Sequence, residues 1–500
     1  MRRGSLFVSC GLILSLLVGC GQSSVNPESV NSTSAVSLSM TDEPPSGVTV
    51  LFFQISLTAA SLTPASSMGT PVSLLNNDTP IQVDVTQLQA LSAFLSTANV
   101  SAGTYNSLTL TFASPQLVIF NAANQSIAST CPVGSVCQLT PQIDNSPTLT
   151  FSSAPFPVTV GQNTPVGLLL DFHLNNVIQS DLSVNLGVTN GVTVGVLPSV
   201  PPPGHPPFGF LEGTVQSVNS SSTPNQFTLQ TRDGRSFTID VNSSTTYGNF
   251  PSAVCATGAF SCLAAGQIVK VQVAGVQGPG MLLAAEVDYV GTASQQVVEG
   301  NIIGLTTAND TTVMTLLLHW SPNATTLPFG GMASVTVSSS ATFSVDSDGF
   351  MIPAGLSFAS ATDLLKGQDV QVDVVGPVVS DTVVGRWIPP SVSFSTDSIE
   401  LEPSQITGTV TAVDSTASTF TISTFPNFFP FWSSPSWMPA QVTVDTTSQT
   451  TYQGLTPDTF AGLTANGLVS VNGWLFSTPS GSTPSTVAAQ MVLGRPTAVF

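Results

Sequence analysis

Side chains able to do acid–base chemistry are sparse along this chain of 500 residues. It holds three histidines, and charged residues make up only 7% of it, against about a quarter in an ordinary soluble domain. His173 follows Asp171 by two residues, which places both side chains on one face of a strand. A catalytic pair is one interpretation, but we favour a polar pair at a strand end. His205 lies in a proline-rich segment and His319 is expected at a strand end. We therefore predict no enzyme, no catalytic residue and no cofactor.

An aspartate pair is the best candidate for metal binding. Asp346 and Asp348 precede Gly349, as at the start of a calcium loop, but the remaining ligands and the closing glutamate are missing. An ordinary Asp-Gly turn explains the same residues. We predict no metal site.

An aromatic segment, residues 425–439, is the strongest candidate for contact with a ligand. It interleaves phenylalanine and tryptophan with proline. A buried loop is the simpler interpretation, and an exposed patch that contacts a sugar, a partner or a membrane is the alternative. The candidate contact residues are Phe428, Phe429, Phe431, Trp432 and Trp437.

The N-terminus carries a segment typical of export. Arg2 and Arg3 precede an apolar stretch too short to span a bilayer, and small residues with a cysteine follow. Residues 17–20, Leu-Val-Gly-Cys, are similar to a bacterial lipobox. This resemblance implies that residues 1–19 are removed and that Cys20 is lipidated and begins the mature chain. An ordinary signal peptide with an incidental cysteine is the alternative.

The residues after the cysteine indicate where the protein resides. Gly21 stands where inner-membrane lipoproteins commonly carry aspartate, so the resemblance favours the outer membrane or the cell surface. Residues 20–34 are rich in serine, asparagine and valine and are expected to form a flexible tether. We therefore predict a bacterial cell-envelope protein held to the membrane by acyl chains on Cys20.

Four further cysteines form two local pairs. Cys131 lies close to Cys137, and Cys255 lies close to Cys262. Outside the cytosol such pairs form disulfides, which we predict for both. A metal site is the alternative, but neither pair has a nearby histidine and zinc requires four ligands.

The charge balance limits the partners. The formal net charge is −19, and it becomes −21 once Arg2 and Arg3 leave with the signal peptide. No lysine or arginine occurs between Arg3 and Arg232. Such a surface cannot neutralise phosphates, so we expect no nucleic-acid partner. Anionic lipid headgroups would repel it, so the membrane contact must come from the lipid.

Valine, threonine, serine, glycine and proline dominate the composition and favour strands joined by turns. We predict a β-sandwich domain over residues 35–197. One helix is expected after Asp84, because Leu88, Leu91 and Leu95 follow it at helical spacing. Residues 198–207 contain six prolines and are expected to form a stiff linker.

The first domain resembles the bacterial family called domain of unknown function 4382. The resemblance covers about a third of the chain and implies a transthyretin-like sandwich without a settled activity. Three short motifs carry it: Thr41, Asp42 and Pro44 in the opening, Gly103 and Tyr105 before a strand, and Leu170, Asp171 and Phe172 in a later strand.

After the linker the sequence repeats itself three times. Gly213, Gly300 and Gly408 are equivalent, and each unit later has a strand introduced by Gly-Gln or, in the third unit, by Asn-Gly. Repeats of this length indicate tandem domains rather than a solenoid. Five or six short strands per unit favour a small barrel, which closes its own edges. We predict three modules, over residues 208–292, 297–403 and 404–497.

These modules resemble the family called domain of unknown function 5666, best over residues 211–290. The resemblance is based on the Gly-Thr-Val opening at Gly213, the paired Phe-Thr strands and the Gly-Gln strand at Gly266. It implies a barrel related to the oligonucleotide/oligosaccharide-binding (OB) fold and no known catalysis. The predicted class is therefore all-β: a transthyretin-like sandwich followed by three OB-like barrels.

This combination favours a lipid-anchored, non-enzymatic envelope or surface protein that presents β-rich binding modules. One alternative is an accessory lipoprotein that binds or processes polysaccharide, and another is a self-associating structural component. The expected partners are the membrane, through Cys20, and either a polysaccharide or another envelope protein.

Overall fold

The fold is described from a computed structural model of the chain. It describes residues 33–43, 50–66, 69–75, 80–88, 92–121, 131–132, 136–179, 181–198, 208–251, 254–255, 258–294, 296–321, 327, 329–347, 349–380, 391–424, 441–477 and 485–495. Several predicted features lie outside these residues: the signal peptide of residues 1–19, Cys20 and most of the tether, residues 199–207 of the linker, Asp348 and the aromatic segment 425–439.

The described part of the chain is all-β, as predicted. Its helical segments are single turns: α1 (Leu174–Val177), η1 (Val85–Leu88), η2 (Phe260–Cys262), η3 (Ala361–Asp363) and η4 (Phe460–Gly462). None of these segments has the length or the apolar run needed to cross a bilayer.

The N-terminal domain is a sandwich of two sheets. One sheet has the order β11 (Val192–Pro198), β10 (Val166–His173), β1 (Thr33–Glu43), β5 (Ala93–Ser101). The other is built on the long pair β2 (Val50–Pro64) and β6 (Gly103–Phe120). Short strands extend that pair: β3 (Val72–Ser73), β4 (Ile81–Asp84), β7 (Val136–Leu139), β8 (Thr148–Phe151) and β9 (Val158–Val160).

Alternating side chains fill the space between the two sheets. In β6 the buried residues Leu108, Leu110 and Phe112 recur every second position, which is the period of a half-buried strand. Phe112 meets Phe172 of the opposite sheet edge to face, with ring centroids 5.5 Å apart. This packing confirms the predicted sandwich.

The helix predicted after Asp84 is wrong. Among the described residues of this segment only the single turn η1 is helical, and Leu95 lies in strand β5. Phe94 and Leu95 are both buried on opposite faces of β5, Leu95 in the sandwich core and Phe94 against barrel 1. Burial on two faces requires an extended strand, and it outweighs the weak helical spacing of the leucines.

Three five-stranded barrels follow the sandwich. Barrel 1 consists of β12 (Gly209–Asn219), β13 (Asn225–Gln230), β14 (Ser236–Val241), β16 (Gln267–Gly278) and β17 (Met281–Thr292), with β15 (Thr246–Gly248) beside it. Barrel 2 consists of β18 (Val297–Ala308), β19 (Thr311–Trp320), β20 (Met332–Val345), β21 (Asp369–Asp373) and β23 (Ser391–Glu402), with β22 (Val375–Ser380) on β23. Barrel 3 consists of β24 (Ser404–Asp414), β25 (Thr419–Thr424), β26 (Gln441–Gln453), β27 (Leu468–Phe476) and β28 (Thr486–Arg495).

The three barrels share one strand order. The first strand pairs with the second and the fourth, the second pairs with the third, and the fifth closes the ring between the third and the fourth. The third and fifth strands run parallel in each barrel, and the other pairs are antiparallel. This closed five-stranded arrangement is OB-like, as predicted.

The repeated glycine has a clear steric role. A Cβ atom on Gly213, Gly300 or Gly408 would lie within 2.3, 2.6 or 2.5 Å of a backbone oxygen on the second strand of the same barrel. Each barrel thus closes tightly at this point, where only glycine fits.

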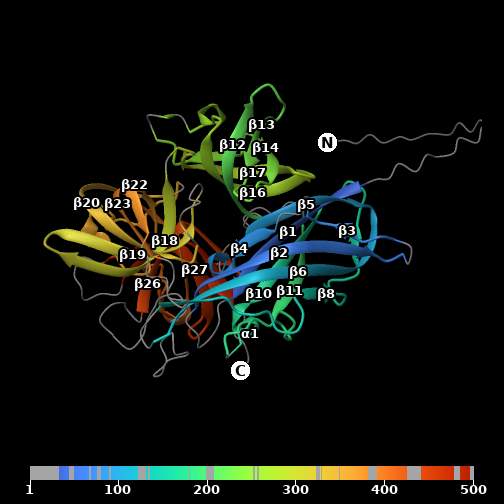
Figure 1. Ribbon diagram of the computed structural model, residues 1–500, viewed down its shortest axis with the longest axis horizontal. Helices are drawn as coiled ribbons and strands as arrows, with labels where there is room; N and C mark the ends of the chain where they lie inside the picture. The colour runs from blue at the N-terminus through green and yellow to red at the C-terminus, as the bar shows by residue number, and fades with distance from the viewer. Residues whose placement is uncertain are drawn as a thin grey trace, which may run out of the picture.

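The four units pack against one another (Figure 1). Barrel 1 continues a sheet of the sandwich, because Phe210 of β12 pairs with Ala93 of β5. Barrel 2 meets the other sheet through an apolar cluster that includes Leu317, Phe52 and Val118. The modules are therefore parts of one body.

Barrels 2 and 3 share part of a core. Trp474 and Phe476 of β27 belong to the buried cluster of barrel 2. The Trp474 Nε1–H donates to the backbone oxygen of Asp346 at 2.6 Å, and Gln368 Nε2 donates to the oxygen of Leu475 at 2.9 Å. These two buried hydrogen bonds orient one barrel on the other.

Candidate functional site

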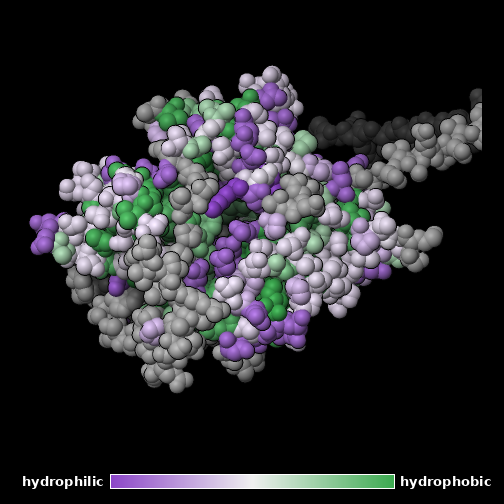
Figure 2. Space-filling view, in the orientation of Figure 1, coloured by the Kyte–Doolittle hydropathy of each residue, from purple (hydrophilic) through white to green (hydrophobic). Residues whose placement is uncertain are grey.

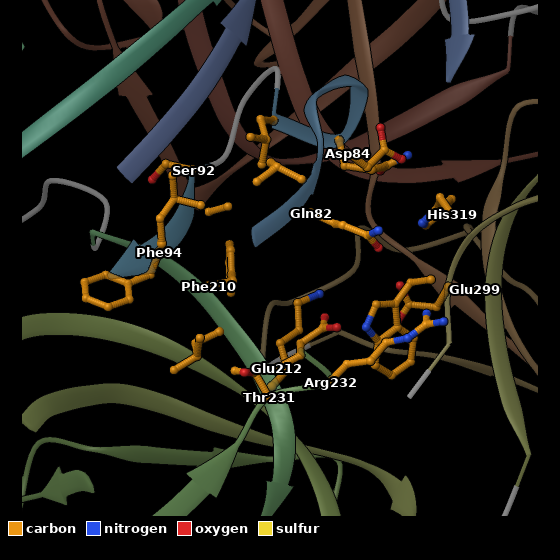
Figure 3. Close-up of a pocket in the computed structure, with 18 of the residues that line it drawn as sticks. Gln82, Asp84, Ser92, Phe94, Phe210, Glu212, Thr231, Arg232, Glu299 and His319 are labelled. Atoms are coloured by element: carbon orange, nitrogen blue, oxygen red, sulfur yellow. The ribbon is translucent and has the colours of Figure 1, made fainter. Parts of the chain in front are cut away.

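A cavity of about 410 Å³ lies where the sandwich and all three barrels meet, and we call it the central cavity. Hydrophilic side chains gather around a hollow near the middle of the face in Figure 2. In Figure 3, Gln82 and Asp84 of the sandwich face Glu212 and Arg232 of barrel 1 across the space, with His319 of barrel 2 at one end. The site is assembled from segments more than 400 residues apart in sequence, since β4 and β28 both contribute.

The walls combine three kinds of side chain. The acidic residues are Asp84, Glu212, Asp233, Glu299, Asp369 and Glu402, and the basic residues are Arg232, Arg235, Lys270 and His319. The aromatic residues are Phe94, Phe210, Trp320 and Phe329, and the amides include Gln82, Gln405, Asn472 and Gln490. Three of the eight lysines and arginines in the whole chain thus line this one cavity.

Barrel 2 contributes a buried ion pair. His319 Nε2 lies 2.8 Å from Asp369 Oδ1, and the two side chains are only 6% and 7% exposed. Burial alone would lower the pKa of His319, but the charges of Asp369, Glu299 and Asp84 and the hydrogen bond to Asp369 raise it to about 9. His319 is therefore an imidazolium at neutral pH, and its N–H donates to Asp369.

The repeat places two glutamates at equivalent positions. Glu212 and Glu299 directly precede the equivalent glycines Gly213 and Gly300 of barrels 1 and 2. Both side chains lie on the outer face of their barrel and line the cavity. Glu212 lies opposite Lys270 in the register of β12 and β16. Burial raises the pKa of Glu299 to about 8, with a further contribution from Glu212, and burial also raises the pKa of Glu212. Proton uptake thus limits the negative charge inside the cavity.

Barrel 3 departs from this pattern. Its equivalent residue is Thr407, whose hydroxyl lies 2.6 Å from that of Ser470. Barrel 3 instead lines the cavity with amides, among them Gln405 and Asn472. The side chains that barrel 3 contributes to the cavity wall are therefore uncharged.

The turn between β13 and β14 ties barrel 1 to its neighbours. Arg235 Nε donates to Asp233 Oδ2 at 2.7 Å, and its Nη1 donates to the backbone oxygen of Leu95 in the sandwich. Arg232 Nη1 donates to the backbone oxygen of Ser321 at 3.2 Å, and its guanidinium stacks 3.8 Å from the ring centroid of Phe329. One turn of five residues therefore bridges three units at the edge of the cavity.

Two buried acceptors in the cavity wall have no hydrogen-bond donor. Asp84 Oδ1 accepts from the backbone N–H of Thr86 at 3.1 Å, whereas Asp84 Oδ2 has no partner. Asn472 Nδ2 donates to Gln490 Oε1 at 3.2 Å, whereas Asn472 Oδ1 has no partner. A buried acceptor without a donor costs about 1–3 kcal/mol, so both atoms favour a ligand or water that donates to them.

Of the candidate site residues that the structure describes, His319 alone lines the cavity. The two disulfides form, Cys131 with Cys137 and Cys255 with Cys262. His173 Nε2 lies 3.8 Å from Asp171 Oδ2, and neither residue lines the cavity. His319 does lie near the end of β19 but also forms part of the cavity wall.

Asp346 is a junction residue between the barrels. Its carboxylate accepts from Asn249 Nδ2 of barrel 1, and its backbone oxygen accepts from Trp474 of barrel 3. Across the described residues no three His, Cys, Asp or Glu side chains are grouped so that they could hold a metal ion.

Sequence reasoning missed most of the cavity residues, although two signals were present. Glu212 and Glu299 recur directly before equivalent glycines, and the few basic residues include the close pair Arg232 and Arg235. Both signals mark outward-facing positions of single modules, and neither shows that the modules face one another.

The structure thus defines a class of protein: a β-sandwich and three OB-like barrels packed around a shared polar cavity. Comparison with known families matches the sandwich, barrel 1 and barrel 3. Residues 33–190 match the family described as Domain of unknown function (DUF4382), and residues 212–288 and 407–476 match Domain of unknown function (DUF5666). Both predicted resemblances are confirmed, in the predicted order. A search of curated proteins finds no significant match.

Proposed function

We propose that the protein is a lipid-anchored, exported binding protein whose ligand site is the central cavity. The observation that carries this proposal is the cavity itself, because four folded units enclose it and it contains two buried acceptors without donors. Its volume of about 410 Å³ lies within the roughly 300–1,000 Å³ range of small-molecule sites.

We propose binding without catalysis. Burial raises the pKa of Asp84, Glu212, Glu299 and Glu402 alike, so none of these four carboxyl groups has a lowered pKa. His319 is held as a cation by Asp369 and has no free acceptor for a substrate proton.

The site can be tested by capture of a ligand from the protein's own cell envelope. Native mass spectrometry of the mature protein mixed with a small-molecule envelope extract should show one bound molecule. Gln82→Trp should weaken or abolish it, because Gln82 projects into the cavity and the bulkier indole obstructs that space. Gln441→Trp, on the exposed start of β26, is the matched control and should retain it. Absence of any adduct, or an adduct undiminished in Gln82→Trp, would contradict the proposal.

The anchor is a separate part of the proposal and is supported by the lipobox-like residues 17–20. Cells fed a radiolabelled fatty acid should label the protein, and Cys20→Ser should remove both the label and membrane association. A wild-type protein that remains unlabelled and soluble would overturn the anchor without affecting the binding site.

A further inference from the structure

We infer that the central cavity takes an uncharged, polyhydroxylated ligand of the saccharide class. This inference rests on the proposed binding function and names the chemistry of its ligand. Three independent features of the wall support it: the orientation of its unmatched hydrogen-bonding groups, its charges and its aromatic and amide content.

The unmatched groups require a ligand that donates hydrogen bonds. Asp84 Oδ2 and Asn472 Oδ1 are both acceptors, and they belong to the sandwich and to barrel 3. Asn472 is only 2% exposed, so bulk water does not satisfy it. A ligand with several hydroxyl groups can donate to both acceptors while its oxygens accept from other groups of the wall.

Three of the four basic side chains of the wall lie next to an acidic one. Arg235 pairs with Asp233, and the His319 imidazolium pairs with Asp369. Lys270 faces Glu212 across the β12–β16 ladder, and its ammonium lies 5.2 Å from the ring centroid of Phe210. Burial raises the pKa of Asp84 to about 6 and that of Glu299 to about 8, so partial protonation of these carboxyl groups near neutral pH weakens the attraction for a cation. The negative charge that remains disfavours an anion, so the wall suits an uncharged ligand best.

Amide side chains and one partly exposed indole, that of Trp320, complete the wall. The Gln82 amide projects into the cavity and offers both a donor and an acceptor, which suits hydroxyl groups of either orientation. Trp320 is half-buried at the wall, and its flat apolar face can cover the C–H face of a sugar ring while its N–H remains available. The acceptors, the amides and the indole together match a small saccharide.

The surface used differs from the one typical of the fold. OB-fold proteins bind ligands mainly on the face of their second and third strands. Here first, fourth and fifth strands supply much of the wall, with Glu212 and Lys270 as examples in barrel 1, and a second strand contributes only at its end, with His319 and Trp320. The ligand site therefore depends on the packing of all four units.

The experiment treats the envelope extract chemically before native mass spectrometry of the full mature chain. Mixed-bed ion exchange removes charged compounds, and the adduct should remain. Periodate cleaves vicinal diols, and the adduct should then be lost. An adduct that ion exchange removes, or that survives periodate, would overturn the saccharide inference while the proposed binding function stands. Absence of any adduct with untreated extract would overturn both.

Two variants test the geometry. Asp84→Asn keeps an oxygen for Thr86 but places an N–H₂ donor at the unmatched position, so adduct formation at sub-saturating extract should fall about tenfold or more. Asp414→Asn is the matched control, because Asp414 Oδ1 accepts from the N–H of Thr416 in an equivalent local turn far from the cavity. Equal adduct levels in Asp84→Asn and the wild type would contradict the inference.

Discussion

The Nε2 atom of His319 lies 2.8 Å from Oδ1 of Asp369, although β19 and β21 are not neighbours in barrel 2. Strand β18 lies between them, and its register with β19 shifts at Glu299 and Gly300. Glu299 pairs with Trp320 and Gly300 pairs with Leu318, which leaves His319 as the extra residue of a β-bulge. A bulge redirects a side chain, and here it turns the imidazole across β18 toward Asp369.

Removal of either partner of this pair should destabilise the protein strongly. His319→Gln or Asp369→Asn leaves one buried charge uncompensated, so the free energy of unfolding should fall by about 3 kcal/mol. The double variant should cost much less than the sum of the two, as measured by denaturant unfolding. His173→Gln is the control and should cost less than about 1 kcal/mol, because its partner lies 3.8 Å away and both side chains are more exposed. Additive costs at His319 and Asp369 would contradict the coupling.

Stability should decrease as the pH rises from 5 to 9. Burial raises the pKa of Glu299 from 4.5 to about 8, so its protonated form stabilises the fold fully below about pH 4.5 and this contribution is lost toward pH 8. The pKa of His319 is raised from 6.5 to about 9, so its contribution is lost between those values.

Glu299→Gln should flatten this pH dependence, because the amide stays neutral throughout. At pH 9 the variant should be more stable than the wild type by about 1 kcal/mol or more, with little difference at pH 5. Asp310→Asn, at the exposed turn between β18 and β19, should leave the slope unchanged. Thermal or urea unfolding across this pH range measures both, and an unchanged slope in Glu299→Gln would show that Glu299 is ionised in the folded protein.

The contact between barrel 2 and the sandwich should depend on Gly330. Its φ of +68° disfavours any side chain, and a Cβ atom there would lie 2.9 Å from the ring of Phe52. Gly349 has a similar φ of +72° but open space around it. A substitution at Gly349 is therefore the control that measures the backbone strain without a steric clash. Gly349→Ala should cost about 1 kcal/mol, and Gly330→Ala should cost more and separate the two units. Faster proteolysis between the units in Gly330→Ala alone would be the expected result, and equal behaviour of the two variants would refute it.

The Gly-Gln repeat should be structural in both barrels that carry it. Gln267 Oε1 accepts from the N–H of Ala264 at 2.7 Å, and Gln368 Oε1 accepts from that of Leu365 at 2.6 Å. Gln368 also donates to Leu475 of barrel 3. Gln267→Leu should lower the free energy of unfolding by about 2 kcal/mol, and Gln368→Leu should lower it further because it also breaks a contact between barrels. A smaller cost at Gln368 would argue against that contact.

The cysteine pairs allow a direct chemical check. A Cys20→Ser chain that begins at residue 20 should show no reactive thiol when it is denatured without reductant, since both disulfides are closed. After reduction it should bind four equivalents of a thiol reagent, from Cys131, Cys137, Cys255 and Cys262. Any thiol that reacts before reduction would indicate an open pair.

Local patterns in the sequence were sufficient to predict much of the fold. Alternating apolar residues, such as Leu108, Leu110 and Phe112, predict strands because each strand buries one face. The equivalent glycines Gly213 and Gly300 mark the repeat because a backbone oxygen approaches each of them closely. The failed helix at Leu88 and Leu95 shows the limit of such patterns, since the second apolar face of β5 is buried by another domain.

The all-β class, the sandwich, the barrel repeat and the cysteine pairing could all be predicted from the sequence, because strand alternation, repeated motifs and close cysteine spacing are local patterns. The cavity between the modules could not be predicted in this way and became visible in the folded chain. Residues such as Glu212, Glu299 and Asn472 face away from their own barrels, and strand alternation alone would place them in solvent. They are buried because neighbouring units pack over them, and that packing depends on surface complementarity between distant segments, which no local pattern records.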